Sequence, residues 1–203
     1  MKTAPRAPES EKVAWLHHEA GENLRFIRES MERGTVFTGL SGRGYVIGGF
    51  TALPAAWLAA QQASTDLWLG VWLLELVLAT CVMLAFTARK ARESGTPLSS
   101  SITSRKLLMA FVPAMLAGGL LSFHLHLAGA TKALPALWLT VYGAAVITAG
   151  AWSIRLIPLM GACFMLLGAL AAFTPLNQDV LLALGFGGLH MGFGLWIWRA
   201  HGG

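Results

Sequence analysis

The feature that most constrains the fold of this chain is a succession of six long apolar runs separated by short polar segments. Each run approaches the roughly 20 residues that an α-helix needs to cross the hydrocarbon core of a bilayer. Of the 203 residues, 55% are hydrophobic and 12% are charged, whereas about a quarter of a soluble domain is charged. The sequence therefore predicts an all-α, polytopic membrane protein.

The predicted spans are separated by Gly, Pro, Ser, Thr and charged residues, which are typical of turns and loops. They cover residues 45–60, 67–88, 107–128, 134–152, a fifth run that ends near Phe173, and 180–198. The predicted organisation is a disordered leader at 1–12, an amphipathic helix and turn at 13–43, a six-helix bundle at 44–199 and a tail at 200–203.

Residues 13–33 carry apolar side chains at spacings of three and four, which places them along one stripe of a helix. The rest of this surface is charged, with acids and bases nearly balanced. A helix that lies among lipid headgroups is expected to be more one-sidedly basic. We therefore expect this helix to pack on the cytoplasmic ends of the spans or to bind a cytoplasmic or membrane protein partner.

The distribution of basic residues predicts the topology. Every Lys and Arg except Lys132 falls in the N-terminal region or in alternate connections, and short basic loops stay in the cytoplasm. Both termini are therefore predicted to be cytoplasmic. The first forty residues are polar, so no cleavable signal peptide is expected. The net charge of +5 could suggest nucleic acid, but the basic residues lie almost entirely on segments that this topology places in the cytoplasm. We therefore expect the bilayer and not nucleic acid as the partner.

Small residues in the first and sixth spans indicate close helix packing. Gly44 and Gly48 are four residues apart, the spacing of a small-residue contact between membrane helices. On the sixth span, Gly185, Gly188 and Gly192 fall on one stripe at about 100° per residue, and Gly187, His190 and Gly194 fall on another. These two small faces predict that the sixth span is approached closely from two sides, and all of these glycines, with Gly44 and Gly48, are candidates for helix contacts.

Two ionisable side chains interrupt the apolar spans, Glu75 in the second and His190 in the sixth. Such a group in the hydrocarbon costs about 2.5 kcal/mol or more, so it usually has a function or a specific partner. At ~1.5 Å of rise per residue, Glu75 and Tyr142 of the fourth span lie about 12 Å from the outer boundary, and His190 about 16 Å. The three side chains are predicted to share one polar layer near the midplane.

Two interpretations of this layer stay open. In the first, Glu75 and His190 share a proton or bind a small ligand, Tyr142 hydrogen-bonds the pair, and the protein senses or passes that ligand. In the second, the same side chains only lock helix packing in a structural or assembly subunit. A membrane enzyme or quinone-binding subunit is a third interpretation, for which the sequence contains no catalytic motif.

The third span adds Ser122 and His126 as candidate ligand-binding residues, because they share a helical stripe that is predicted to face the protein. His124 points about 200° away from His126, so the two cannot hold one ion together. The depths of His126 and His190 differ by roughly 10 Å, which argues against a haem between them. We therefore predict no metal and no cofactor.

Two stretches of the sequence stand out by their residue pattern. One is LRFIRESMER at 24–33, which leads into Phe37 and Thr38, and the other is LGFGGLHMGFG at 184–194. In these stretches the chain resembles a family of small, uncharacterised, bacterial multi-pass membrane proteins. The resemblance implies a location in the bacterial inner membrane. It assigns no functional residue, because the family has no established activity.

Overall fold

The computed structural model describes Trp15 and residues 18–27, 39–93 and 102–202. The chain divides into two compact units, Met1–Thr35 and Val36–Gly203. In the first unit, residues 18–27 are helical and exposed. The leader at 1–12 and the remainder of the helix at 13–33 lie outside the described residues, Trp15 excepted. The role expected of that helix stays a prediction.

The second unit is helical in each of its long described segments. Its helices are α2 (Gly42–Ala59), α3 (Thr65–Glu93), α4 (Ile102–Leu127), α5 (Leu134–Gly150), α6 (Leu156–Phe173), α7 (Gln178–Leu182) and α8 (His190–His201). A single 3-10 turn, η1 (Thr131–Ala133), precedes α5. A π-helical segment, η2 (Ala183–Leu189), joins α7 to α8 in one continuous helix. The all-α fold is confirmed for the described residues.

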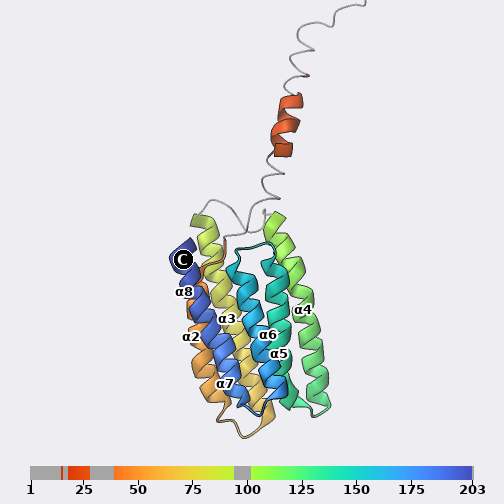
Figure 1. Ribbon diagram of the computed structural model, residues 1–203, viewed down its shortest axis with the longest axis vertical. Helices are drawn as coiled ribbons and strands as arrows, with labels where there is room; N and C mark the ends of the chain where they lie inside the picture. The colour runs from red at the N-terminus through yellow and green to blue at the C-terminus, as the bar shows by residue number, and fades with distance from the viewer. Residues whose placement is uncertain (1–14, 16–17, 28–38, 94–101, 203) are drawn as a thin grey trace, which may run out of the picture. The chain divides into compact units, whose positions relative to one another are not determined.

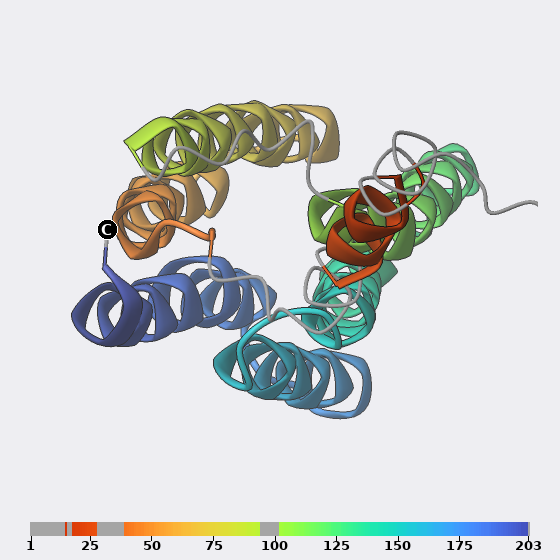
Figure 2. The same cartoon turned by 90° about the horizontal axis from the view of Figure 1, so that it is seen from above.

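The long helices of the second unit lie side by side along a common direction (Figure 1). Seen from above, they form an arc in which α2 lies between α3 and α8 (Figure 2). α2 packs against both of these neighbours, whereas α5 packs against α6 on one side and α4 on the other. α2 is therefore the element that connects α3 to the helix formed by α7, η2 and α8.

Five described helices are long and apolar enough to cross a membrane. They cover Thr65–Glu93, Thr103–Leu127, Thr131–Gly150, Leu156–Phe173 and Gln178–His201. Large apolar side chains on α3 and α4 are exposed, including Leu74 and Met109. Such extensive exposed apolar surface is expected where lipid, not water, surrounds a protein. The chain has the character of a membrane protein, and five of the six predicted spans are confirmed as helices of this kind.

The first predicted span, at 45–60, corresponds to α2, which is not among those five. α2 begins after Ser41, whose Oγ accepts a hydrogen bond from the amide of Gly44 at 3.3 Å. It contains Arg43 and Pro54, and all its buried residues are Gly or Ala. This composition makes α2 less apolar than the other long helices, but it allows α3 and α8 to approach its backbone closely.

The contact between α2 and α3 uses the glycines that the sequence singled out. A Cβ on Gly44 would lie 3.0 Å from the Cβ of Phe86, and a Cβ on Gly48 would lie 3.0 Å from Cε of Met83. Both positions therefore have little room for a side chain. Gly185 is similarly enclosed, since its Cβ would lie 2.6 Å from Cδ2 of Leu139 on α5.

The prediction was wrong for Gly188 and Gly192, where an added Cβ would meet nothing within 4 Å. The close contacts with α2 are made by Gly187 and Gly194, the glycines of the second stripe. Spacing groups the glycines of a helix into faces, but it does not tell which face meets a neighbour.

Candidate functional site

The sixth predicted span positions His190 directly after the π-helical segment, where it is 3% exposed. Its Nδ1 lies 3.0 Å from the carbonyl oxygen of Phe186, and its Nε2 lies 2.7 Å from the hydroxyl of Tyr142 on α5. A carbonyl can only accept, so in the neutral imidazole Nδ1 carries the hydrogen. Nε2 is then an acceptor, and the Tyr142 hydroxyl donates to it.

Aromatic rings surround this imidazole. The ring centroids of Tyr45, Tyr142, Phe164 and Phe186 lie 5.6, 5.4, 5.3 and 6.2 Å from that of His190. The rings come from α2, α5, α6 and η2, so four elements of the bundle meet at one side chain. The imidazole is thereby shielded from solvent and held in a single orientation by its two hydrogen bonds.

α2 approaches the backbone beside His190 because Gly49 has no side chain. A Cβ on Gly49 would lie 2.7 Å from the carbonyl oxygen of Gly187 and 2.9 Å from Cβ of His190. π-helical turns inside α-helices occur frequently at functional sites. Here the π-helical segment, the glycine contact and the buried histidine coincide.

The second buried ionisable group, Glu75 of α3, is 6% exposed and faces α2. Its Oε1 lies 2.9 Å from Oγ1 of Thr51. The same Oγ1 lies 2.9 Å from the carbonyl oxygen of Gly48, one turn earlier on α2. No ion pair joins Glu75 to any other described residue.

The geometry around Thr51 depends on whether Glu75 carries a proton. A hydroxyl has one hydrogen to donate, but Thr51 Oγ1 is close to two oxygens that accept when Glu75 is ionised. Protonated Glu75 can donate to Thr51, which then donates to Gly48, so that both short contacts are hydrogen bonds. Ionised Glu75 competes with Gly48 for the single hydrogen. Protonation therefore changes the number of hydrogen bonds that the Thr51 hydroxyl makes, from one to two, and so removes the competition between its contact within α2 and its contact with α3.

Trp72 lies one helical turn before Glu75 and is 5% exposed. Its indole ring packs near Phe186, with the centroids 6.2 Å apart. Its Nε1 hydrogen is buried and has no hydrogen-bond partner among the described residues. A buried donor without a partner costs about 1–3 kcal/mol, so this part of the interior is not a fully satisfied polar network.

The structure brings Tyr142 and His190 together, but it does not join Glu75 to them. The direct partner of Glu75 is Thr51, and the direct partner of His190 is Tyr142. The proton sharing expected between Glu75 and His190 therefore has no direct hydrogen bond to support it. Depth along the spans places a side chain at a level of the bundle, but does not tell which neighbour it faces.

Ser122 and His126 belong to a different group of contacts. Ser122 Oγ accepts a hydrogen bond from Nε1 of Trp138 at 2.8 Å and donates to the carbonyl oxygen of Gly118 at 2.7 Å. His126 Nε2 lies 3.4 Å from Oδ1 of Asp66, at the start of α3. These contacts link α4 to α5 and α3, and neither residue hydrogen-bonds to the buried pairs described above.

The candidate site also contains residues that sequence reasoning missed, chiefly Thr51, Trp72, Phe164 and Phe186. Thr51 could have been found, because it continues the Gly44 and Gly48 stripe at the next helical spacing. The aromatic residues carry no such signal, since a single Phe in an apolar span is ordinary. Among the described residues, no three His, Cys, Asp or Glu side chains are grouped to hold a metal ion.

Comparisons with models of protein families, with curated proteins and with solved structures find no match to this chain. Inference of the function therefore rests on the sequence and on the geometry of the described residues.

Proposed function

We propose that this chain is a six-span membrane protein that senses protonation of Glu75 through the contact between α2 and α3. The span proposed in addition to the five long apolar helices is α2, the first in chain order, whose 18 residues extend about 27 Å at ~1.5 Å per residue and run alongside α3 and α8. The distribution of basic residues supports cytoplasmic termini. The resemblance noted in the sequence supports a bacterial inner membrane.

The observation that carries this proposal is the position of the Thr51 hydroxyl, 2.9 Å from both Glu75 and the Gly48 carbonyl. Because one hydrogen cannot serve both oxygens, addition of a proton to Glu75 lets Thr51 keep its hydrogen bond to Glu75, between the helices, and its hydrogen bond to Gly48, within α2, at the same time. A carboxyl group that only locked the packing would be expected to have a partner in a fixed arrangement. Protonation instead selects between two arrangements.

The signal has a structural route through α2. One side of α2 carries Thr51 against Glu75, and another carries Gly49 against Gly187 and His190. A change in how α2 meets α3 therefore reaches the π-helical segment directly. In the proposed protein, the N-terminal segment at 13–33, which precedes α2 in sequence, transmits this change to a cytoplasmic partner.

The test is the infrared spectrum of the purified protein in lipid across the pH range in which it stays folded. A protonated carboxylic acid has a carbonyl band that disappears on ionisation, and the difference between wild type and Glu75→Gln assigns it. Thr51→Val should shift the titration midpoint of that band, whereas Thr51→Ser, which keeps the hydroxyl, should preserve it. A carboxyl band that never titrates would refute the proposal.

Proton passage is a separate outcome that liposomes distinguish from sensing. Reconstituted protein that senses but does not conduct should leave a pH gradient intact, as Glu75→Gln should. Rapid dissipation by the wild type that is lost in Glu75→Gln would replace sensing by proton passage through the same group. Dissipation that persists in Glu75→Gln would contradict both uses of Glu75.

The topology is tested by labelling single cysteines in a chain in which Cys81 and Cys163 are replaced by Ala. Glu93→Cys, at the end of α3, should react with a membrane-impermeant thiol reagent only from the cytoplasmic side. Lys132→Cys, before α5, should react only from the outside. Labelling of both from one side would refute the six-span arrangement.

A structural or assembly subunit is the second candidate, because each buried pair joins different helices. In that protein Glu75 and Tyr142 act only as interhelical hydrogen-bonding groups, each contributing about 0.6 kcal/mol and at most about 2 kcal/mol. Glu75→Leu should then lower stability without any effect on a pH response. An unchanged stability in Glu75→Leu would exclude this second candidate.

A further inference from the structure

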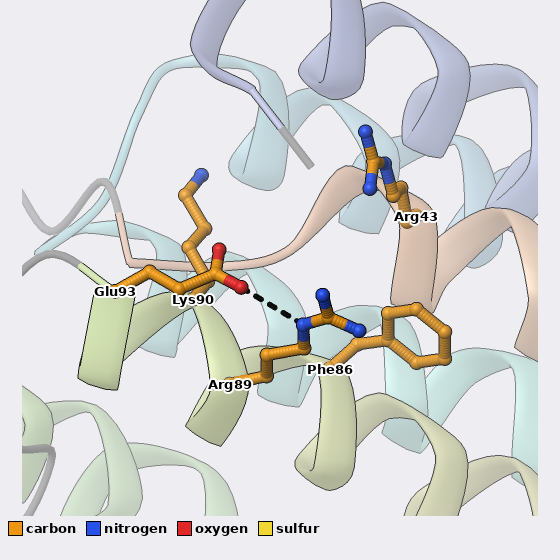
Figure 3. A pocket seen from close by; sticks show the side chains of 5 residues that line it. All are labelled: Arg43, Phe86, Arg89, Lys90 and Glu93. Carbon is orange, nitrogen blue, oxygen red and sulfur yellow. Dashed lines mark hydrogen bonds and ion pairs between the residues drawn. The ribbon is translucent and has the colours of Figure 1, made fainter.

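A basic recess lies between the first turn of α2 and the last turns of α3. It is lined by Arg43 from α2 and by Phe86, Arg89, Lys90 and Glu93 from α3 (Figure 3). Three cationic side chains and one carboxylate therefore meet at one end of the bundle. The net positive charge favours an anionic ligand.

Contacts within the protein hold the two guanidinium groups. The Cζ of Arg43 lies 5.0 Å from the centroid of the Trp198 ring, and Nε of Arg89 donates to Oε1 of Glu93 at 2.8 Å. Because Nε is the atom that Glu93 holds, the terminal nitrogens of Arg89 keep their hydrogens for another acceptor. Two positioned guanidiniums are suited to a phosphate group, which they can bind through paired hydrogen bonds.

Lys90 has a different role in the same recess. Its ammonium group points away from the two guanidiniums in Figure 3. It donates to the carbonyl oxygens of Leu40 at 3.0 Å and His201 at 2.9 Å, and so binds the segment before α2 to the end of α8. Lys90 therefore fixes the wall of the recess, and the two guanidiniums are the groups of the lining that could bind an anion.

Exposed apolar side chains lie on the same side of each helix as its arginine. On α2, Ile47 and Phe50 follow Arg43 at spacings of four and seven residues and are 39% and 62% exposed. On α3, Leu78 precedes Arg89 by eleven residues on the same side and is 46% exposed. A free phosphate has no apolar part that could contact these side chains, whereas the acyl chains of a lipid would cover them.

We propose that this recess binds the phosphate of an anionic phospholipid, with Arg43 and Arg89 on the headgroup and the acyl chains along α2 and α3. The site does not depend on the role proposed for Glu75. It places a specific lipid at the contact between two helices, in the leaflet that faces the basic end of the bundle.

The experiment measures lipid retained by the full-length protein in native mass spectrometry, using phosphatidylglycerol and phosphatidylcholine with identical acyl chains. Wild type should retain phosphatidylglycerol preferentially. The double variant Arg43→Gln/Arg89→Gln should lose roughly tenfold or more of that preference, because it lacks both charge-assisted contacts. Arg105→Gln/Arg155→Gln removes the same charge from exposed positions outside the recess and should change the preference less than about threefold.

An equal loss in both double variants would overturn the proposal in favour of a general attraction to negative membranes. Displacement of the lipid by glycerol phosphate at matched concentration would overturn it in favour of a site for a free phosphate. If the double variant does not fold, the single variants Arg43→Gln and Arg89→Gln carry the test. Each should then weaken retention more than Arg105→Gln alone, and equal retention would refute the site.

Discussion

Replacement of Gly49 by Ala tests whether close contact between α2 and the π-helical segment stabilises the fold. The added methyl group would lie 2.7 Å from the carbonyl oxygen of Gly187 and 2.9 Å from Cβ of His190. Neither atom belongs to the far end of a flexible side chain, so the two helices must separate. Overpacking of this kind costs about 1–3 kcal/mol, whereas Ala gains up to ~1 kcal/mol of helix propensity over Gly.

We therefore expect Gly49→Ala to lower the free energy of unfolding by about 1–2 kcal/mol. The measurement is reversible unfolding in mixed micelles with increasing mole fraction of SDS. Gly192→Ala is the matched control, since its methyl group would meet nothing within 4 Å. Equal stability of the two variants would show that α2 does not approach η2 as closely as described, and would remove the proposed route from Thr51 to His190.

Two further changes test individual hydrogen bonds, each followed by the same unfolding measurement. Tyr142→Phe should lower the free energy of unfolding by about 1–2 kcal/mol, because it removes the donor to His190 Nε2 and leaves a buried acceptor without a partner. Adding Phe164→Tyr to this variant should not restore the lost stability. Lys90→Met should cost about 1 kcal/mol and increase proteolysis near residue 201, because the ammonium group no longer holds the last carbonyls of α8; unchanged proteolysis would contradict this role.

The helices of this protein were predictable because each apolar run is long enough to indicate that lipid surrounds it. Lipid selects residue type over some 20 consecutive positions, so the five helices that are long and apolar enough to cross a membrane could be predicted from the order of residues alone. α2 is the one long helix of the second unit's described residues that is not among these five. Its glycines and Arg43 serve helix contacts and an end of the bundle, and they dilute the apolar signal.

The partners of the buried polar groups were less predictable. Counting residues placed Glu75, Tyr142 and His190 at similar depths, but only the pairing of Tyr142 with His190 is a direct contact. Which way a side chain points depends on how the helices are ordered around the bundle, and on the local period. The glycines of the sixth span show the same limit, because their spacing defined two faces but did not tell that the face of Gly187 and Gly194 would meet α2.

The position of the His190 imidazole depends on how tightly the π-helical segment before it is wound. Seven consecutive residues are wound with a wider turn immediately before His190, while the helix on either side is wound normally. If these residues tightened to the α-helical pitch, a shift of the helix by one residue would turn its C-terminal part by about 100° relative to its N-terminal part. The imidazole would then swing off Tyr142 with no change in the number of residues in the membrane.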